Sequence, residues 1–243
     1  MRVAVISDIH GNLHALESVL SALEPHSPEE IWCLGDLVGY GPRPNECVAL
    51  VAQQTSICLV GNHDLGVLGR IDLAEFSPDA EAGARWTRSV LSPENRVILE
   101  SLPSSAETPH GAAQLFHASP RDPVWEYVLS AQAARDALEA TSAPLVLVGH
   151  SHVPLAIRPK GRGVAGGIAP GGFEVELEGR WLLNPGSVGQ PRDGDPRAAV
   201  LLLDLERRFA KFHRVAYPIE RTQRELREHG LPEPLALRLE HGM

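Results

Sequence analysis

Short apolar runs alternate along the chain with stretches of helical spacing, and this alternation is the feature that most restricts the fold. Residues 3–6, 31–34 and 57–60 are apolar runs typical of buried strands. Between them, residues 12–23 and 45–51 are predicted helices, since their apolar residues recur every three or four positions. Strands that alternate with helices favour right-handed crossovers and a parallel sheet. We therefore expect an α/β fold.

Polar motifs follow directly after the predicted strands. They are Asp8-Ile9-His10-Gly11-Asn12, Gly35-Asp36, Gly61-Asn62-His63-Asp64, a single His117 and Gly149-His150-Ser151-His152. In parallel sheets, ligands bind beyond the carboxyl ends of the strands, so these side chains are expected to meet there. The mixture of carboxylate, amide and imidazole groups suits first-row divalent metals. A site for two ions needs about seven protein ligands, which is what the motifs together supply.

Each motif has an ordinary structural explanation when it is taken alone. Gly35-Asp36 also serves as a turn, Asn62 as a helix cap, and a histidine pair after a strand is as often structural as metal-binding. The tetrapeptide that starts at Gly61 is the most specific signal. Its His63-Asp64 pair suggests an imidazole oriented by a carboxylate, the arrangement used in acid–base catalysis. The combination, and no single motif, predicts the site.

Composition and charge restrict the class of protein. The 243 residues are 43% apolar and 22% charged, as in ordinary globular proteins, and we expect residues 1–243 to form one domain. The net charge of −9 opposes sequence-independent binding of long nucleic acids, which depends on Lys and Arg. No apolar run approaches the roughly 18 residues of a membrane span, and the first run is too short for a signal peptide. We expect a cytoplasmic protein, and three cysteines without a C-x-x-C pair predict reduced thiols.

Residues 65–104 break the alternation of strands and helices. Residues 80–91 have helical spacing, and Ser92-Pro93 predicts the start of another helix. We predict a helical insertion that lies as a cap over the site, with scaffold helices that play no part in selectivity as the alternative. After residue 105 the chain is richer in predicted strands, which fall at 153–158, 173–177, 181–183, 198–205 and 209–215. Six glycines within 161–172 predict a flexible loop, and the tail from Pro218 is predicted to be helical.

The order and approximate spacing of the motifs resemble those of the calcineurin-like metallophosphoesterase family. The turn Asn184-Pro185-Gly186-Ser187 extends this resemblance through most of the chain. The stretches Gly39-Tyr40-Gly41-Pro42 and His117-Ala118-Ser119-Pro120-Arg121-Asp122 are similar to those of small bacterial phosphodiesterases, including members named as diadenosine tetraphosphatases. The resemblance implies a four-layer αββα sandwich of two mixed β-sheets flanked by helices. It also implies a metal-dependent phosphoric ester hydrolase.

The resemblance implies a role for each polar motif. Asp8, His10 and His152 would hold one divalent ion, Asn62, His117 and His150 the second, and Asp36 both. His63 would act on the leaving oxygen or the transition state, with Asp64 to orient it, and Asn12 would contact a substrate phosphate. Hydrolysis would proceed by in-line attack of a hydroxide that bridges the ions. Manganese is the first candidate, and iron, zinc, nickel, cobalt and magnesium suit the same ligands.

The substrate stays open between a phosphodiester or small nucleotide and a phosphomonoester or phosphoprotein. A catalytically silent interaction module is a further alternative, because a retromer subunit in the family keeps the fold and binds partners. That relative lacks the histidine after the motif asparagine, whereas this chain has His63. Selectivity is expected from residues 65–104, 41–45 and 121–127. Arg121 and Arg192 are candidate contacts to phosphate or nucleotide, with solvated surface arginines as the ordinary alternative.

Overall fold

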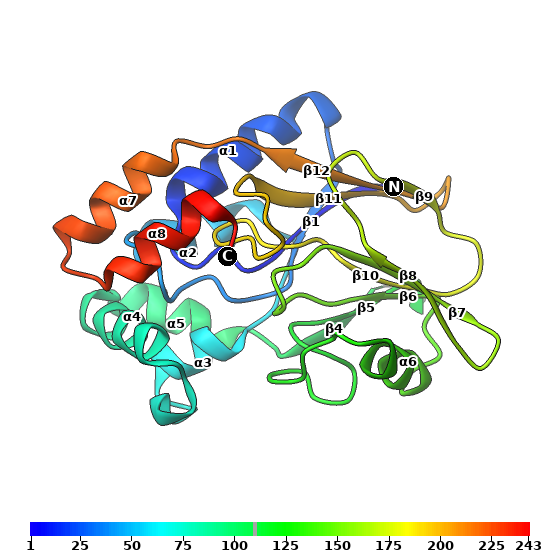
Figure 1. Ribbon diagram of the computed structural model, residues 1–243, viewed down its shortest axis with the longest axis horizontal. Coiled ribbons are helices and arrows are strands. Elements are labelled where there is room, and N and C mark those ends of the chain that lie inside the picture. The colour runs from blue at the N-terminus through cyan, green and yellow to red at the C-terminus, as the bar shows by residue number, and fades with distance from the viewer. Residues whose placement is uncertain (109–110) are drawn as a thin grey trace.

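The computed structural model describes residues 1–108 and 111–243 and contains two mixed β-sheets that pack face to face (Figure 1). The strands of the first sheet are β1 (Arg2–Ile6), β2 (Glu30–Cys33), β3 (Ile57–Cys58), β9 (Glu174–Glu176), β11 (Ala198–Asp204) and β12 (Phe209–Val215), in the order β3-β2-β1-β11-β12-β9. Those of the second are β4 (Ser105–Glu107), β5 (Gln114–Phe116), β6 (Leu145–Leu147), β7 (Leu155–Lys160), β8 (Gly163–Ile168) and β10 (Trp181–Asn184), in the order β4-β5-β6-β10-β7-β8.

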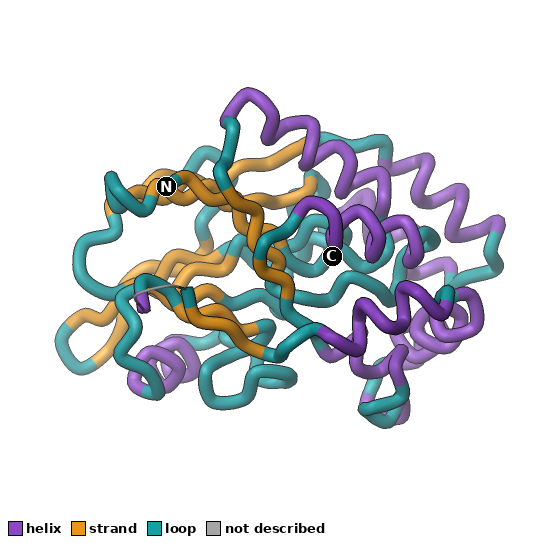
Figure 2. The backbone as a smooth tube through the Cα atoms, turned by 180° about the vertical axis from the view of Figure 1, so that it is seen from behind, coloured by secondary structure: helices purple, strands orange, loops and turns teal. Residues whose placement is uncertain are grey.

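Helices lie outside both sheets. They are α1 (Leu13–Leu23), α2 (Pro44–Gln54), α3 (Asn62–Leu68), α4 (Pro78–Val90), α5 (Pro93–Ser101), α6 (Ala131–Glu139), α7 (Ile219–Glu228) and α8 (Glu233–His241), with short 3₁₀ turns η1 (Glu24–His26) and η2 (Leu73–Glu75). Seen from behind, most of the helices gather at one end of the two sheets (Figure 2). The helices expected in the first half and in the C-terminal tail are confirmed. Within the described residues, no helix has the length and apolar character needed to cross a bilayer.

The alternation of side chains along β1 explains the layers. Val3 and Val5 lie in the apolar core between the two sheets, whereas Ala4 and Ile6 face the opposite way and pack in the core that α1 and α2 cover. On the far side of the second sheet, α6 packs its alanines and Leu138 against β6 and β7. The order is therefore helix, sheet, sheet, helix, as the four-layer αββα prediction requires (Figure 1).

The parallel pairs place the polar motifs along one edge. In the first sheet β1 runs parallel to β2 and β2 to β3, so the residues after each strand emerge on the same side. In the second sheet β5 runs parallel to β6. His117 directly follows β5, and the His150 motif follows β6. Both sheets thus direct their motif-bearing loops toward the seam between them.

The glycine-rich loop prediction for 161–172 is wrong. Residues Gly163–Ile168 form β8, which pairs with β7 in an antiparallel hairpin. Glycine is needed here because Gly166 has φ +108°, and a Cβ at this position would lie 2.0 Å from the carbonyl oxygen of Ala156. A close backbone approach accounts for the glycine at position 166.

The segment 65–104 is helical, as predicted. Its helices α4 and α5 pack on α3 and α2, and Ala80 and Trp86 belong to an apolar cluster with α8. Phe76, in the connection before α4, places its ring edge-on 4.9 Å from the ring of His63. That this segment caps the site stays a prediction. The three cysteines are free thiols, with Cys33 and Cys47 buried.

Candidate metal centre

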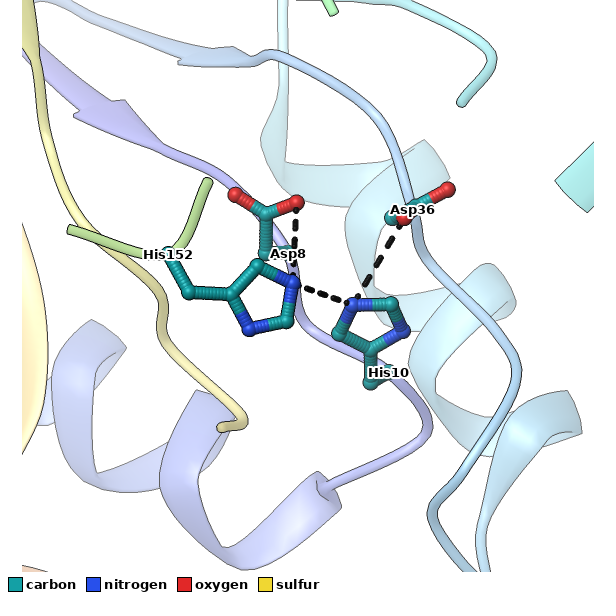
Figure 3. Close-up of side chains that lie close together, drawn as sticks. All are labelled: Asp8, His10, Asp36 and His152. Carbon is teal, nitrogen blue, oxygen red and sulfur yellow. Dashed lines mark hydrogen bonds and ion pairs between the residues drawn. The ribbon is translucent and has the colours of Figure 1, made fainter. Parts of the chain in front are cut away.

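Four residues of the predicted ligand set meet at the edge of the first sheet. Asp8, His10, Asp36 and His152 are buried, and each offers one ligand atom within 4.8 Å of the others (Figure 3). The Nε2 atoms of His10 and His152 are 3.0 Å apart. His152 Nε2 lies 3.6 Å from Oδ1 of Asp8, and His10 Nε2 lies 3.6 Å from Oδ2 of Asp36. His10 and His152, which are 142 positions apart in the sequence, thus point toward the same place.

A second group adjoins the first. Asp36, His117 and His150 are buried and also converge within 4.8 Å. His117 Nε2 lies 3.5 Å from Asp36 Oδ2 and 3.2 Å from Oδ1 of Asn62. The structure therefore places Asn62 beside this group. We use the name Asp/His cluster for the residues of both groups, which are Asp8, His10, Asp36, His117, His150 and His152.

Asp36 is the member that the two groups share. Its Oδ2 atom lies between Nε2 of His10 and Nε2 of His117 and has no hydrogen-bond partner among the described residues. Its other oxygen, Oδ1, accepts a hydrogen bond from the backbone N–H of His63 at 2.8 Å. A buried carboxylate oxygen without a donor is costly. A cation on either side of Oδ2 would remove that cost.

Backbone carbonyls fix the ring orientation of three imidazoles. Nδ1 of His10, His117 and His152 lies 3.1, 2.9 and 2.6 Å from the carbonyl oxygens of Val38, Leu34 and Gln190, respectively. Because a carbonyl only accepts, each Nδ1 donates, and Nε2 of a neutral ring keeps its lone pair. Two such lone pairs then face each other across 3.0 Å in His10 and His152. This arrangement fits a bound metal ion, whose histidine ligands commonly donate their other N–H in this way.

Burial shifts the pKa values of the carboxylates and the imidazoles in opposite directions. It raises the pKa of Asp8 to about 7, and burial together with the nearby Asp64 raises the pKa of Asp36 well above its usual value. It lowers the pKa of His10 and His152 well below the usual range and that of His150 to about 2. The rings are therefore neutral and ready to act as ligands, while the carboxylates need positive charge nearby to ionise.

The backbone of the cluster is unusual. Asp8, His10, Asp36, His150 and His152 all have φ between +51° and +61°. Residues other than glycine seldom adopt this left-handed region, and such conformations concentrate at functional sites. The loops are also close to their neighbours, since a Cβ on Gly61 would lie 2.1 Å from Oδ1 of Asp36. Sharp turns directly after the strands thus aim these side chains at the seam.

His63 lies beside the cluster without joining it. Its ring packs against Tyr40, with centroids 4.4 Å apart, and edge-on against His10 at 4.8 Å. Its Nδ1 atom is buried and has no hydrogen-bond partner in the described parts of the chain. Burial lowers the pKa of this imidazole well below its usual value. A neutral ring in this position can still donate one N–H to a group bound at the cluster.

The carboxylate of Asp64 is hydrogen-bonded to backbone N–H groups, and its orienting role toward His63 stays a prediction. Its Oδ1 atom accepts hydrogen bonds from the backbone N–H groups of Leu37 and Val38 at 2.9 and 3.1 Å, and Oδ2 accepts from Gly61 N–H at 2.9 Å. Asp64 lies in the first turn of α3, which turns its carboxylate back toward these N–H groups. The carboxylate therefore holds the loops that carry Asp36 and Asn62.

The side-chain amide of Asn12 also has partners within the protein. Its Oδ1 atom accepts from Ala15 N–H at 3.2 Å and from the Thr222 hydroxyl at 2.9 Å, and its Nδ2 donates to the carbonyl of Gly189 at 2.8 Å. It is 1% exposed and caps helix α1. These bonds hold the Asn12 side chain inside the protein, and a phosphate contact by this residue stays a prediction.

Residues after β10 support the histidines of the second sheet. Asn184 Nδ2 donates to the carbonyl of Gly149 at 2.7 Å and to the Ser151 hydroxyl at 3.0 Å, and the Ser187 hydroxyl donates to the carbonyl of Asp8 at 2.7 Å. The turn that begins at Asn184 is thus hydrogen-bonded to the loops that carry His150 and Asp8. Sequence reasoning missed Gln190 and Tyr40. Gln190 acts through its carbonyl, which no side-chain pattern can indicate, whereas the Gly39-Tyr40-Gly41 stretch was a visible signal.

Comparison with known proteins places the chain among metal-dependent phosphoesterases. Residues 1–208 match the model of the calcineurin-like phosphoesterase superfamily domain. The crystal structure of a metallophosphoesterase from Sphaerobacter thermophilus is 43% identical, with a TM-score of 0.91 over 100% of this chain and 99% of that one. An uncharacterised protein of Methanocaldococcus jannaschii is 39% identical over 98% of this chain and 96% of its own. A symmetrical bis(5'-nucleosyl)-tetraphosphatase of Actinobacillus pleuropneumoniae is 26% identical over 56% of this chain and 52% of its own length.

Proposed function

The chain belongs to the calcineurin-like phosphoesterase superfamily and is a phosphoric ester hydrolase, and from this premise we propose that it cleaves phosphodiesters or small nucleotides at a two-metal centre. One ion would be held by Asp8, His10 and His152, the other by Asn62, His117 and His150, and Asp36 would bind both. Manganese is our first candidate for both ions. The protein would act on small phosphorylated molecules.

The observation that carries this proposal is the position of Asp36. Its unpartnered Oδ2 atom lies 3.6 Å from the ring nitrogen of His10 in one group and 3.5 Å from that of His117 in the other. A carboxylate that serves two ions holds them about 3.5–4 Å apart, the separation at which both can act on one phosphate. A single-metal site would need only one of the two groups.

Divalent ions bound here would polarise the phosphate oxygens and lower the pKa of a coordinated water. The chain's own residues then do the rest. Asp64 and the backbone carbonyls hold the ligand loops and rings in place. His63, fixed by the rings of Tyr40 and Phe76, can donate its N–H to the leaving oxygen. The buried walls limit the water that can compete for these groups.

An aromatic rim supports a nucleotide as the substrate. Tyr127 stacks on the ring of His150 with centroids 3.9 Å apart, and Trp125 lies edge-on to both His150 at 6.5 Å and Phe76 at 5.5 Å. Tyr127 is 45% exposed, so part of its ring surface is open to a partner. Stacking on aromatic side chains recognises any nucleobase. The tetraphosphatase relative, which acts on a dinucleoside substrate by its name, agrees with this choice.

The test is turnover by metal-stripped protein with each divalent metal added back in turn. Bis(p-nitrophenyl) phosphate reports diester cleavage, and p-nitrophenyl phosphate reports monoester cleavage. We expect metal-dependent hydrolysis of the diester in preference to the monoester, followed by cleavage of dinucleoside polyphosphates in a nucleotide screen. Faster cleavage of the monoester would identify a phosphomonoester phosphatase instead. Two bound ions without turnover of any ester would contradict the proposal and favour an interaction module.

A further inference from the structure

Arg192 lies in the loop after β10, and its backbone is tied to the Asp/His cluster. Its N–H donates to the carbonyl oxygen of His152 at 3.3 Å. Two residues earlier, the carbonyl of Gln190 accepts the hydrogen bond that orients the ring of His152. The loop whose Gln190 carbonyl orients the ring of His152 therefore also carries Arg192. A shift of this loop would move the side chains of His152 and Arg192 together.

The guanidinium of Arg192 has only neutral partners. Its Nη2 atom donates to the side-chain oxygen of Gln190 at 2.9 Å and to the Tyr40 hydroxyl at 3.3 Å. Its Cζ atom lies 5.8 Å from the centroid of the Tyr40 ring. Within the described residues the guanidinium forms no ion pair. An arginine of this kind keeps its charge available for an anion.

Tyr40, whose hydroxyl accepts a hydrogen bond from the guanidinium, packs against the cluster. The ring of Tyr40 lies edge-on to that of His10, with centroids 4.7 Å apart. The Tyr127 ring stacks on His150. Tyr40 comes from a loop of the first sheet and Tyr127 from a loop of the second. Through Tyr40 and the carbonyl oxygen of His152, Arg192 is thus attached to the group of ligands that contains His10 and His152.

Arg121 provides the contrast. It is the other arginine whose sequence position suggested a phosphate contact. In the structure its Nη1 atom lies 2.8 Å from Oδ2 of Asp136 and 3.5 Å from Oε1 of Glu126, and its side chain is 48% exposed. Its charge is already paired at the surface. A phosphate would have to displace carboxylates from Arg121 but only neutral groups from Arg192.

We propose that Arg192 binds a phosphate group of the substrate at the mouth of the Asp/His cluster, with Tyr40 and Gln190 as the residues that position it. The inference rests on the proposed function and adds a substrate-binding residue to it. A guanidinium offers a planar pair of N–H donors that matches two phosphate oxygens. The charge-assisted bonds that result are stronger than the neutral contacts that they replace.

The experiment measures inorganic phosphate binding to metal-loaded protein by calorimetry, with metal content determined for each variant. Arg192→Gln is expected to weaken phosphate binding about tenfold or more, because hydrogen bonds to charged groups contribute about 1.5–3 kcal/mol. Arg192→Lys should restore part of this loss, since it keeps the charge without the planar fork. Arg121→Gln, the matched control, should bind phosphate as the parent protein does. All four proteins should hold the same amount of metal.

The outcomes separate this inference from the function on which it rests. If Arg192→Gln binds phosphate as tightly as the parent and keeps its kcat/KM for bis(p-nitrophenyl) phosphate, the assignment of Arg192 is wrong while the esterase activity stands. If Arg192→Gln loses metal as well as phosphate, Arg192 supports the cluster and does not bind substrate. If the metal-loaded parent protein neither binds phosphate nor cleaves esters, the proposed function itself is wrong.

Discussion

The two sheets contribute different chemistry to the seam between them. The first sheet contributes the candidate oxygen ligands Asp8, Asp36 and Asn62, which follow its strands, together with one imidazole, that of His10. Loops of the second sheet supply imidazoles alone, from His117, His150 and His152. The Asp/His cluster therefore draws on both sheets, and the apolar core between them holds these two sets of loops together.

The difference is also electrostatic. Burial makes the carboxylates of the first sheet hard to ionise and the imidazoles of His150 and His152 in the second hard to protonate. The first sheet therefore gains most from positive charge at the seam, and the second supplies ligands that need no change of protonation. A divalent cation satisfies both demands at once. Substitutions confined to one sheet should accordingly change metal binding and activity differently from substitutions confined to the other.

The largest effect is expected from Asp36→Asn, because Asp36 is shared by the two ligand groups. The amide keeps the size of the side chain and an oxygen that can accept the hydrogen bond from His63 N–H. It removes the negative charge between the two imidazole nitrogens. Loss of outer partners of metal ligands already costs 10–100-fold, so we expect kcat/KM for the diester to fall more than about 100-fold and bound metal to decrease.

The control is Asp72→Asn, which makes the same chemical change at an exposed cap of η2. Since asparagine caps as well as aspartate, this variant should keep both metal and activity. Metal content by elemental analysis and kcat/KM are measured together. Full metal content and activity in Asp36→Asn would show that the first sheet does not bridge the two groups.

The next effect separates His63 from Asp64, which are adjacent in sequence but serve different parts of the site. His63→Ala should lower kcat at least about tenfold with metal retained, since acid–base groups contribute about 10²–10⁴-fold. Asp64→Asn should weaken metal binding, because its carboxylate holds the Leu37 and Val38 N–H groups next to Asp36. In the double variant, the fold decreases in kcat/KM that the two single changes cause should multiply. A double variant no worse than His63→Ala would instead mean that Asp64 acts through His63.

These two residues show where sequence reasoning stops. Alternating apolar runs predicted the layers and the order of elements, because burial dictates that pattern. The ligand types after each strand predicted which side chains would meet. What a polar side chain contacts depends on backbone groups that fold in from elsewhere. The carboxylate of Asp64 and the amide of Asn12 satisfy backbone donors and acceptors, and a motif cannot indicate these contacts.

Backbone geometry was the other limit. Helix α3 was missed because Asn62 and His63 were interpreted as loop ligands, although they also form the first turn of a helix. The left-handed conformations of Asp8 and His150 leave no sign in residue type, since neither is a glycine. Conversely, the glycines of β8 suggested a loop, although the segment is a strand in which close pairing requires glycine at position 166. Arg121 and Arg192 looked equivalent, and only their partners distinguish them.

The smallest effect is the dependence of metal affinity on pH, and it tests the electrostatic contrast between the sheets. In metal-free protein, burial raises the pKa of Asp8 to about 7, so this carboxyl keeps a proton until the pH rises through that value. Metal binding requires the ionised form and should release the proton. His150, with a pKa lowered to about 2, is already neutral and has none to release. Apparent metal affinity should thus rise from about pH 6 to 8, by about tenfold per pH unit for each proton released.

Calorimetry in buffers of different ionisation enthalpy measures the number of protons released, and paired variants identify their source. His150→Gln removes a ligand from the second sheet but should leave the released protons at the parent value. Asp8→Asn removes a ligand from the first sheet and should lower that number at pH 7, because the titrating carboxyl is gone. The reverse result, with proton release lost in His150→Gln and kept in Asp8→Asn, would place the titrating groups on the imidazoles. The two sheets would then differ in where their ligands lie but not in which ligands release protons.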